Sequence, residues 1–173
     1  MALTFDGTVG ITTPALLNGG ANGSGNIGSA STYFNTVFAK ATSAQYADLA
    51  ENYLADAEYP AGTVIEFGGP VEVTISTQSH SNRVAGVVST NPAYQMNTGL
   101  AGDCVAVVAL TGRVPCQVVG TIVKGDCVVA SDIPGVATAL DLTQYTPGCV
   151  IGKALENYQS EHVGTIAVVV GRV

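Results

Sequence analysis

Two histidines are the side chains best suited to acid–base or metal chemistry in this sequence, His80 and His162. Each lies in a polar stretch, TQSHSN at 77–82 and QSEH at 159–162, which predicts a solvated loop position. A Ser-His-acid triad stays open because geometry defines it, but no GxSxG elbow accompanies either histidine. Two histidines far apart in the sequence are also a poor metal site. We therefore expect no catalytic, cofactor-binding or metal-binding residue.

Four carboxylates close together in the sequence suggest paired acids for glycoside hydrolysis: Asp48, Glu51, Asp56 and Glu58. Such an enzyme holds two carboxyl groups roughly 5 to 10 Å apart, usually beside aromatic platforms for sugar rings. The chain has no tryptophan and only 6% aromatic residues, so it offers few platforms. We expect these acids to form the solvated face of a helix, with a cation-bridged contact as the alternative.

The four cysteines are candidate metal ligands or disulfide partners: Cys104, Cys116, Cys127 and Cys149. Their spacing matches neither paired CxxC knuckles nor another zinc pattern. Each stands where a strand would carry a small apolar residue, and free cysteine is among the most buried residue types. We expect reduced core cysteines, with disulfides as the alternative.

The composition narrows the classes of partner. Thirteen acidic and six basic residues give a net charge of -7, and no basic run is present, which argues against a nucleic-acid groove. Hydrophobic residues make up 47% of the chain, yet no apolar run is long enough to span a bilayer, so we expect no membrane insertion. The first residues lack the basic and apolar regions of a secretory signal, which predicts folding in the cytoplasm.

Residues 1–32 predict an extended arm rather than a globular domain, because they are rich in Gly, Asn and Ser. The stretch 23–28 matches the GxGxxG expression of dinucleotide sites but lacks the strand and helix that such a site needs. A few apolar side chains of the arm still need burial, and we expect three arms to wrap around one another to provide it. These side chains form the expected oligomer interface: Phe5, Val9, Ile11, Leu16 and Leu17.

Residues 33–59 connect the arm to the rest of the chain. The stretch 33–39 is rich in aromatic and β-branched residues and predicts a short strand. Ser43 is a candidate N-cap, and apolar residues near 3.6-residue spacing predict a helix over 43–57 that ends before Pro60. An extended segment along a neighbouring chain is the alternative for 43–57.

Residues 60–173 predict a globular domain of short, valine-rich strands separated by Gly and Pro turns. The strand candidates are 63–67, 71–77, 83–89, 104–110, 113–119, 126–130, 137–140, 149–155 and 165–170. No helical pattern intervenes between them, which excludes a parallel α/β sheet. The fold class is therefore all-β, a compact barrel or β-clip-like domain with one short helix at most.

A weak internal repeat relates residues 61–90 to residues 124–155. Each copy has a turn, a strand, a Gly/Pro break, a second strand, a loop and a third strand with a central glycine. Two copies are too few for a solenoid, so the pattern predicts a pseudo-symmetric domain. The central glycines, Gly86 and Gly152, predict β-bulges or a close approach of backbones.

Several linked motifs resemble the C-terminal domain of bacteriophage tail-fibre and related virion structural proteins. They are ADLAE at 47–51, DAEYPAGTV at 56–64, VAGVVSTNPAY at 84–94, LTGRVP at 110–115, VKGD at 123–126 and GCVIGKAL at 148–155. The resemblance covers about residues 33–173, and the Gly/Asn-rich start is similar to the shafts that precede such domains.

This resemblance implies a homotrimeric virion protein that is assembled in the host cytoplasm and contacts other virion proteins. A host-surface receptor is a further implied partner. The candidate contact segment is a loop that holds Asn91, Tyr94, Met96 and Asn97, with packing of this loop on the neighbouring subunit as the alternative. Two alternatives stay open. The segment 86–92 is distantly similar to self-cleaving chaperone domains, although the Ser-Asp and Arg-Lys features of their Ser-Lys version are missing, and 124–135 is similar to β-clip modules of capsid decoration proteins.

Overall fold

The computed structural model describes residues 47–171 and, before them, 15, 17, 19–21, 26–29 and 31–36. The chain divides into two compact units, Met1–Thr42 and Ser43–Val173. In the first unit the described residues form neither helix nor strand, so the strand expected over 33–39 is absent from 33–36, while 37–39 lie outside the described residues. Of the expected arm interface only Leu17 is described, and it is 86% exposed; Phe5, Val9, Ile11 and Leu16 lie outside the described residues.

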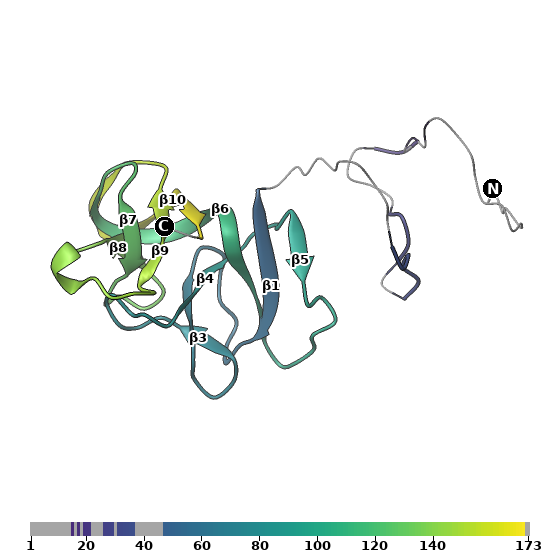
Figure 1. Ribbon diagram of the computed structural model, residues 1–173, viewed down its shortest axis with the longest axis horizontal. Coiled ribbons are helices and arrows are strands. Elements are labelled where there is room, and N and C mark those ends of the chain that lie inside the picture. Colours follow the sequence, from purple (N-terminus) through teal and green to yellow (C-terminus); the bar gives the residue numbers. More distant parts are fainter. Residues whose placement is uncertain are drawn as a thin grey trace, which may run out of the picture. The chain divides into compact units, whose positions relative to one another are not determined.

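The second unit is built from strands, as the all-β prediction requires (Figure 1). The strands are β1 (Asp48–Leu54), β2 (Val64–Phe67), β3 (Val73–Ile75), β4 (Val84–Val88), β5 (Tyr94–Met96), β6 (Val105–Ile122), β7 (Cys127–Ala130), β8 (Ala137–Ala139), β9 (Val150–Ala154) and β10 (Tyr158–Val170). One turn of 3-10 helix, Leu142–Gln144, interrupts them. In the described part of the chain, no helix is long and apolar enough to cross a membrane.

The helix predicted over 43–57 is wrong, because its described part holds strand β1. Burial alternates along β1, with Asp48, Ala50 and Asn52 buried and their neighbours half-buried, which is the two-residue period of a strand. The backbone of β1 pairs with β6 on one side and with β5 on the other. These pairings to residues far along the chain satisfy the peptide groups that a helix would have satisfied locally.

The two strands predicted over 104–110 and 113–119 are one long strand, β6. We predicted a turn at Gly112, but the chain runs straight through it. A side chain at Gly112 would overlap the carbonyl oxygen of Ala47, so the glycine permits a close backbone contact at the start of β1. The residue serves packing between strands rather than chain reversal.

The second half of this unit is a closed five-stranded barrel. The strands follow the order β10-β9-β7-β8-β6, and pairing of β10 with residues 112–122 of β6 closes the ring. Most neighbours are antiparallel, but β6 and β8 pair in parallel at Val118 and Ala137. We call this ring the second module, residues 112–170.

The first half repeats the same ring with β1, β3, β2, β4 and the beginning of β6. β1 pairs with residues 105–112 of β6, β6 with β4, β4 with β2, and β2 with β3. A parallel bridge between Ala55 and Val73 completes the circle, in the place that the parallel pairing of Val118 and Ala137 takes in the second module. We call this ring the first module, residues 48–111; β6 runs through both modules (Figure 1).

The two modules also share their irregularities. The pairing of β2 with β4 shifts register next to Ile65, which lies opposite Gly86, and the pairing of β7 with β9 shifts next to Val128, which lies opposite Gly152. A side chain at Gly86 would overlap the carbonyl oxygen of Ala109. One at Gly152 would overlap that of Val169. Both central glycines therefore combine a register shift with a close backbone approach, as the sequence predicts.

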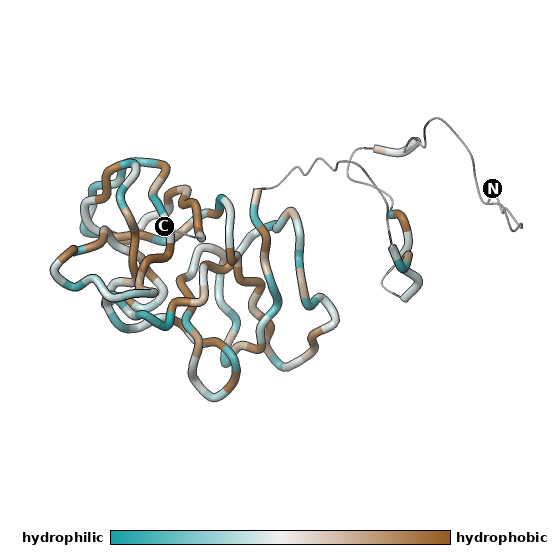
Figure 2. Tube along the Cα trace, in the orientation of Figure 1, coloured by the Kyte–Doolittle hydropathy of each residue, from teal (hydrophilic) through white to brown (hydrophobic). Residues whose placement is uncertain are grey.

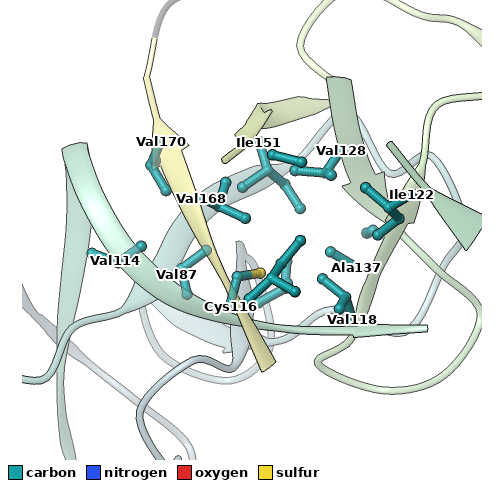
Figure 3. Packing of buried hydrophobic residues seen from close by; sticks show 14 of the residues in the cluster. Val87, Val114, Cys116, Val118, Ile122, Val128, Ala137, Ile151, Val168 and Val170 are labelled. Atoms are coloured by element: carbon teal, nitrogen blue, oxygen red, sulfur yellow. The ribbon is translucent and has the colours of Figure 1, made fainter. Parts of the chain in front are cut away.

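Buried apolar side chains fill both modules, and hydrophobic residues follow their strands (Figure 2). In the second module small aliphatic side chains from several strands, among them Val118, Val128, Ile151 and Val168, point toward one another around Cys116 (Figure 3). A smaller cluster in the first module contains Ala55, Ile65, Val73, Val88, Ala106 and Val108. The strands thus form a rigid support on which surface residues can be positioned.

Candidate partner-contact site

The segment expected to contact a partner contains strand β5, which lies beside β1. The two strands run parallel, and Leu49, Ala50 and Glu51 pair with Tyr94, Gln95 and Met96. Their first contact is a 2.8 Å hydrogen bond from the Ala93 N–H to the Asp48 carbonyl oxygen. The sequence analysis expected a loop here, because a three-residue strand is too short to give a recognisable pattern.

The second module has no counterpart of β5. In the first module residues 89–104 connect β4 to β6, whereas residues 155–157 connect β9 to β10 and form no strand. Since both modules form the same ring, the longer connection is not needed to close a barrel. Long ordered connections that the fold does not require are the usual location of binding residues.

Buried polar groups of β1 hold this connection in place. The Ser89 hydroxyl donates a 2.7 Å hydrogen bond to the Asp48 carboxylate, and both residues are buried. Asn52, also buried, accepts from Gln95 Nε2 at 2.6 Å through its side chain and from Asn97 Nδ2 at 3.1 Å through its carbonyl oxygen. Such a preorganised segment loses little conformational entropy when a partner binds.

The outward side chains of this segment are polar or aromatic. Tyr94 is 64% exposed, Asn91 and Asn97 are exposed, and Met96 is half-buried. Tyrosine offers a large contact area with a polar hydroxyl at low entropic cost, and asparagine offers both donors and acceptors. Among the described strands β5 pairs only with β1, so its other edge pairs with no strand in the described part of the chain. The structure therefore brings Tyr94, Met96 and Asn97 onto one exposed strand and its end, with Asn91 in the turn before it.

The arrangement at His80 is a structural contact between the modules. Its Nε2 accepts a 3.1 Å hydrogen bond from the Asp141 backbone N–H, which leaves the proton of the neutral ring on Nδ1. Nδ1 lies 2.8 Å from the Ser79 hydroxyl and donates to it, so this histidine cannot remove the Ser79 proton. His162 is exposed on β10 rather than in the loop that we predicted.

The four clustered acids lie on β1 and the turn after it, each in its own environment. Asp48 is buried against Ser89, which corrects the expectation of a solvated helix face. The Tyr53 hydroxyl donates a 2.8 Å hydrogen bond to Glu51, and burial together with this contact raises the pKa of Tyr53 to about 12. Hydrogen bonds from Tyr59 and Thr74 lower the pKa of Asp56 below its ordinary value, and Glu58 is exposed.

One buried charge was missed by the sequence analysis. Glu66 on β2 is buried and accepts hydrogen bonds from the Ser81 hydroxyl at 2.7 Å and from Arg83 at 2.6 Å. The available signal was a single acid inside the apolar run VIEF at 64–67. The equivalent residue of the second module is Val129, so the fold does not require a charge there.

All four cysteines are free in the structure, which agrees with the prediction of reduced cysteines. Cys116 and Cys149 are buried and the other two are half-buried. Burial raises the pKa of the Cys116 thiol to about 12, which keeps it protonated and unreactive. Within the described part of the chain no three His, Cys, Asp or Glu side chains gather around a common point.

Comparisons with known proteins find a likeness in fold. Neither a family model nor a curated protein matches the sequence. A solved structure that does match is described as the pre-mature bacteriophage phi29 gene product 12, with a TM-score of 0.57 and 14% sequence identity. The match covers 79% of this chain but only 23% of that protein. The chain therefore shares a fold with part of a larger bacteriophage protein.

Proposed function

We propose that this chain is a bacteriophage virion structural protein, a component of a trimeric tail fibre or appendage that takes part in host attachment. The observation that carries the proposal is the tandem-barrel unit, whose fold is similar to part of a bacteriophage gene product. Linked sequence motifs that resemble those of tail-fibre proteins support the same class.

Self-association is supported by apolar surface in both units. Leu17, Ile27, Tyr33 and Phe34 are exposed in the first unit, and Leu142 and Tyr145 are exposed in the second. Burial of these side chains against a second copy would remove apolar surface from water and so favour association. Light scattering on the purified chain should give three times its 17.5 kDa mass, and a stable monomer at micromolar concentration would contradict the trimer.

Attachment to a host receptor is supported by β5 and its connection. The segment is ordered by buried polar contacts, is not needed to close the barrel and presents Tyr94 to solvent. The net charge of -7 favours a receptor recognised through aromatic and amide contacts over an acidic polymer.

The decisive test of the proposed function locates the chain on a particle. Phage particles are purified from bacteria infected with the phage that encodes this chain. Antibodies against the purified chain should label the tail appendage of these particles. Label over the head would favour a capsid decoration protein instead. Absence of the chain from purified, infectious particles would contradict any virion role.

A self-cleaving chaperone domain is the second candidate, and one observation favours it. The similar structure is described as a pre-mature form, which implies a later mature form of that protein. If this chain processes itself, its intact mass should change on incubation into two fragments that sum to 17.5 kDa. An unchanged mass after prolonged incubation of the assembled protein would exclude this second candidate.

A further inference from the structure

Strand β5 lies at the edge of the second unit (Figure 1). It pairs with β1 on one side, and no strand in the described part of the chain pairs with its other side. Gln95, the middle residue of β5, is exposed. The unpaired N–H and C=O groups of an edge strand can accept a segment of another chain as a further strand.

The register of β1 shows which peptide groups of β5 are free. The Ala55 N–H donates a 3.0 Å hydrogen bond to the Cys104 carbonyl oxygen, so between its register shift and its end β1 turns the peptide groups of odd-numbered residues toward β6. Those of even-numbered residues face β5, and the Asn52 carbonyl oxygen accordingly accepts from Asn97. Ala50 lies opposite Gln95, and in a parallel pair only one of two opposite residues turns its peptide groups toward the other strand. The N–H and C=O of Gln95 therefore point to the free side of β5.

The segment that contains β5 carries no charged side chain. No Asp, Glu, Lys or Arg occurs in residues 84–102, although the chain as a whole has a net charge of -7. A partner that covers this segment therefore removes none of its charges from water, and two acidic copies do not repel each other there. Residues 7–39 are the other long stretch without these four residue types. The uncharged part of the arm can thus approach the uncharged segment around β5.

The end of this uncharged arm, residues 33–39, has a strand-forming sequence. The stretch YFNTVFA combines aromatic and β-branched residues, which are the types enriched in strands. Its described part, residues 33–36, nevertheless forms no strand. Tyr33 is 80% exposed and Phe34 is 63% exposed. The arm therefore carries strand-forming residues that have no sheet to join in the described part of the chain.

The chain length between the described part of this stretch and β1 allows it to reach a neighbouring copy. Residues 37–47 connect the two. A connection of this length spans at most roughly 40 Å when fully extended. A small domain has a diameter of about 30 Å. The stretch can therefore extend past its own second unit to the β5 edge of an adjacent chain.

We propose that the free side of β5 binds residues 33–39 of a neighbouring copy as an added strand. β5 supplies peptide groups without a partner, and the stretch supplies strand-forming residues without a sheet. The added strand lies in the plane of the sheet beside Gln95, so the exposed side chain of Tyr94, which stands off that plane, stays available to a further partner. The contact joins the arm of one copy to the second unit of the next, and it generates a ring when the rotation between copies closes. It goes beyond a virion role because it specifies how the copies are joined.

Crosslinking between full-length chains tests the proposal. Two chains with different tags are co-expressed, one with Tyr94→Cys and the other with one of Tyr33→Cys, Phe34→Cys, Asn35→Cys and Thr36→Cys. Side chains alternate between the two faces of a strand, and same-face neighbours on adjacent strands lie roughly 5 to 8 Å apart. A short bifunctional thiol reagent should therefore join Tyr94→Cys to two alternate positions, either 33 and 35 or 34 and 36, and leave the other two unlinked.

Two matched variants show whether the link has the expected geometry. Gln95→Cys lies on the opposite face of β5 and should join the two positions that Tyr94→Cys leaves unlinked. Val163→Cys, at an exposed valine on β10, should join none of the four. Absence of a mixed covalent species at all four positions, or equal yields at all four, overturns the proposal. Because the tags mark different chains, a strand added within one chain gives no mixed species and also overturns it.

A proline in the middle of β5 tests the added hydrogen bonds directly. Gln95→Pro removes the N–H on the free side, whereas Gln95→Ala removes the same side-chain contact with Asn52 and keeps the N–H. The two variants should have similar melting temperatures, but Gln95→Pro should lower the yield of the Tyr94→Cys crosslink about fivefold relative to Gln95→Ala, the effect of roughly one hydrogen bond. Equal yields overturn pairing along this edge. Both measurements use the chain alone, so their failure is distinct from a failure to label phage particles.

Discussion

The two modules form the same ring of five strands but differ in what they present to solvent. Both have a register shift opposite a central glycine, and both close through a parallel contact next to the turn that precedes Val73 or Ala137. They differ in an added strand and in an ion pair between the buried Glu66 and the exposed Arg83. Features shared by the modules therefore belong to the fold, whereas the differences indicate where the chain meets other molecules.

The largest expected effect tests the shared part. Gly86→Ala and Gly152→Ala each place a methyl group against a backbone carbonyl oxygen, so each should lower the free energy of unfolding by about 3 kcal/mol or more. Chemical denaturation measures the free energy of unfolding of both variants. Gly99→Ala is the control, because nothing lies near that position. If alanine at either central glycine lowers the free energy of unfolding no more than Gly99→Ala does, the two modules are not equivalent at this position.

A smaller effect comes from the ion pair that only the first module has. Glu66→Gln removes the charge that Arg83 and Ser81 contact, and should destabilise the protein by about 2 kcal/mol. Replacing the pair by apolar residues, Glu66→Val with Arg83→Ala, imitates the second module and should recover at least half of this loss. A double variant less stable than Glu66→Gln would show that the charge is needed for the fold.

The strand that only the first module has predicts an effect on binding rather than on stability. Tyr94→Ala removes the most exposed aromatic side chain of the partner-contact site and should weaken attachment to host cells about tenfold. The melting temperature should not change, because the side chain lies outside both cores. Val163→Ala is the control, and equal attachment by both variants would remove β5 from the binding site.

The smallest expected effect compares two residues at the same place in the two rings, Tyr53 and Cys116. Burial raises the pKa of each to about 12, from ordinary values of 10 and 9. A raised pKa means that the folded state holds its proton more tightly, so stability is complete below the ordinary value and falls as the pH rises toward 12. For Cys116 the loss between pH 9 and 10 should be about 1 kcal/mol.

Substitution identifies the groups responsible for this alkaline loss. Cys116→Ala should flatten the decline of stability above pH 9, and Tyr53→Phe should flatten it only above pH 10. Denaturant titrations across this range measure both slopes. An unchanged slope in Cys116→Ala would mean that its thiol does not titrate on unfolding.

The sequence predicts the strands well where local signals and packing agree. Gly86 and Gly152 stood out as central glycines because a strand interior rarely accepts glycine without a packing reason. The helix over 43–57 was predicted wrongly because apolar residues there fit both periods, and only pairing with β5 and β6 decides between them. Gly112 was read as a turn because sequence shows the missing side chain but not the strand that needs the space.

The candidate surfaces were predictable only in part. Tyr94 and its neighbours were found as a polar and aromatic segment, but the strand that orders them depends on Asp48 and Asn52, distant in the sequence. The different burial of Val64 and Cys127 could not be predicted, since both lie in ordinary apolar strands. Their difference appears only when the equivalent ends of the two barrels are compared in three dimensions.

Amide hydrogen exchange on the full-length protein tests most directly whether the two modules form the same ring of strands. Peptides covering β2 and β4 should exchange about as slowly as peptides covering β7 and β9, because each of these strands pairs with a neighbour on both sides. Rapid exchange in the strands of one module, with those of the other protected in the same sample, would contradict the account.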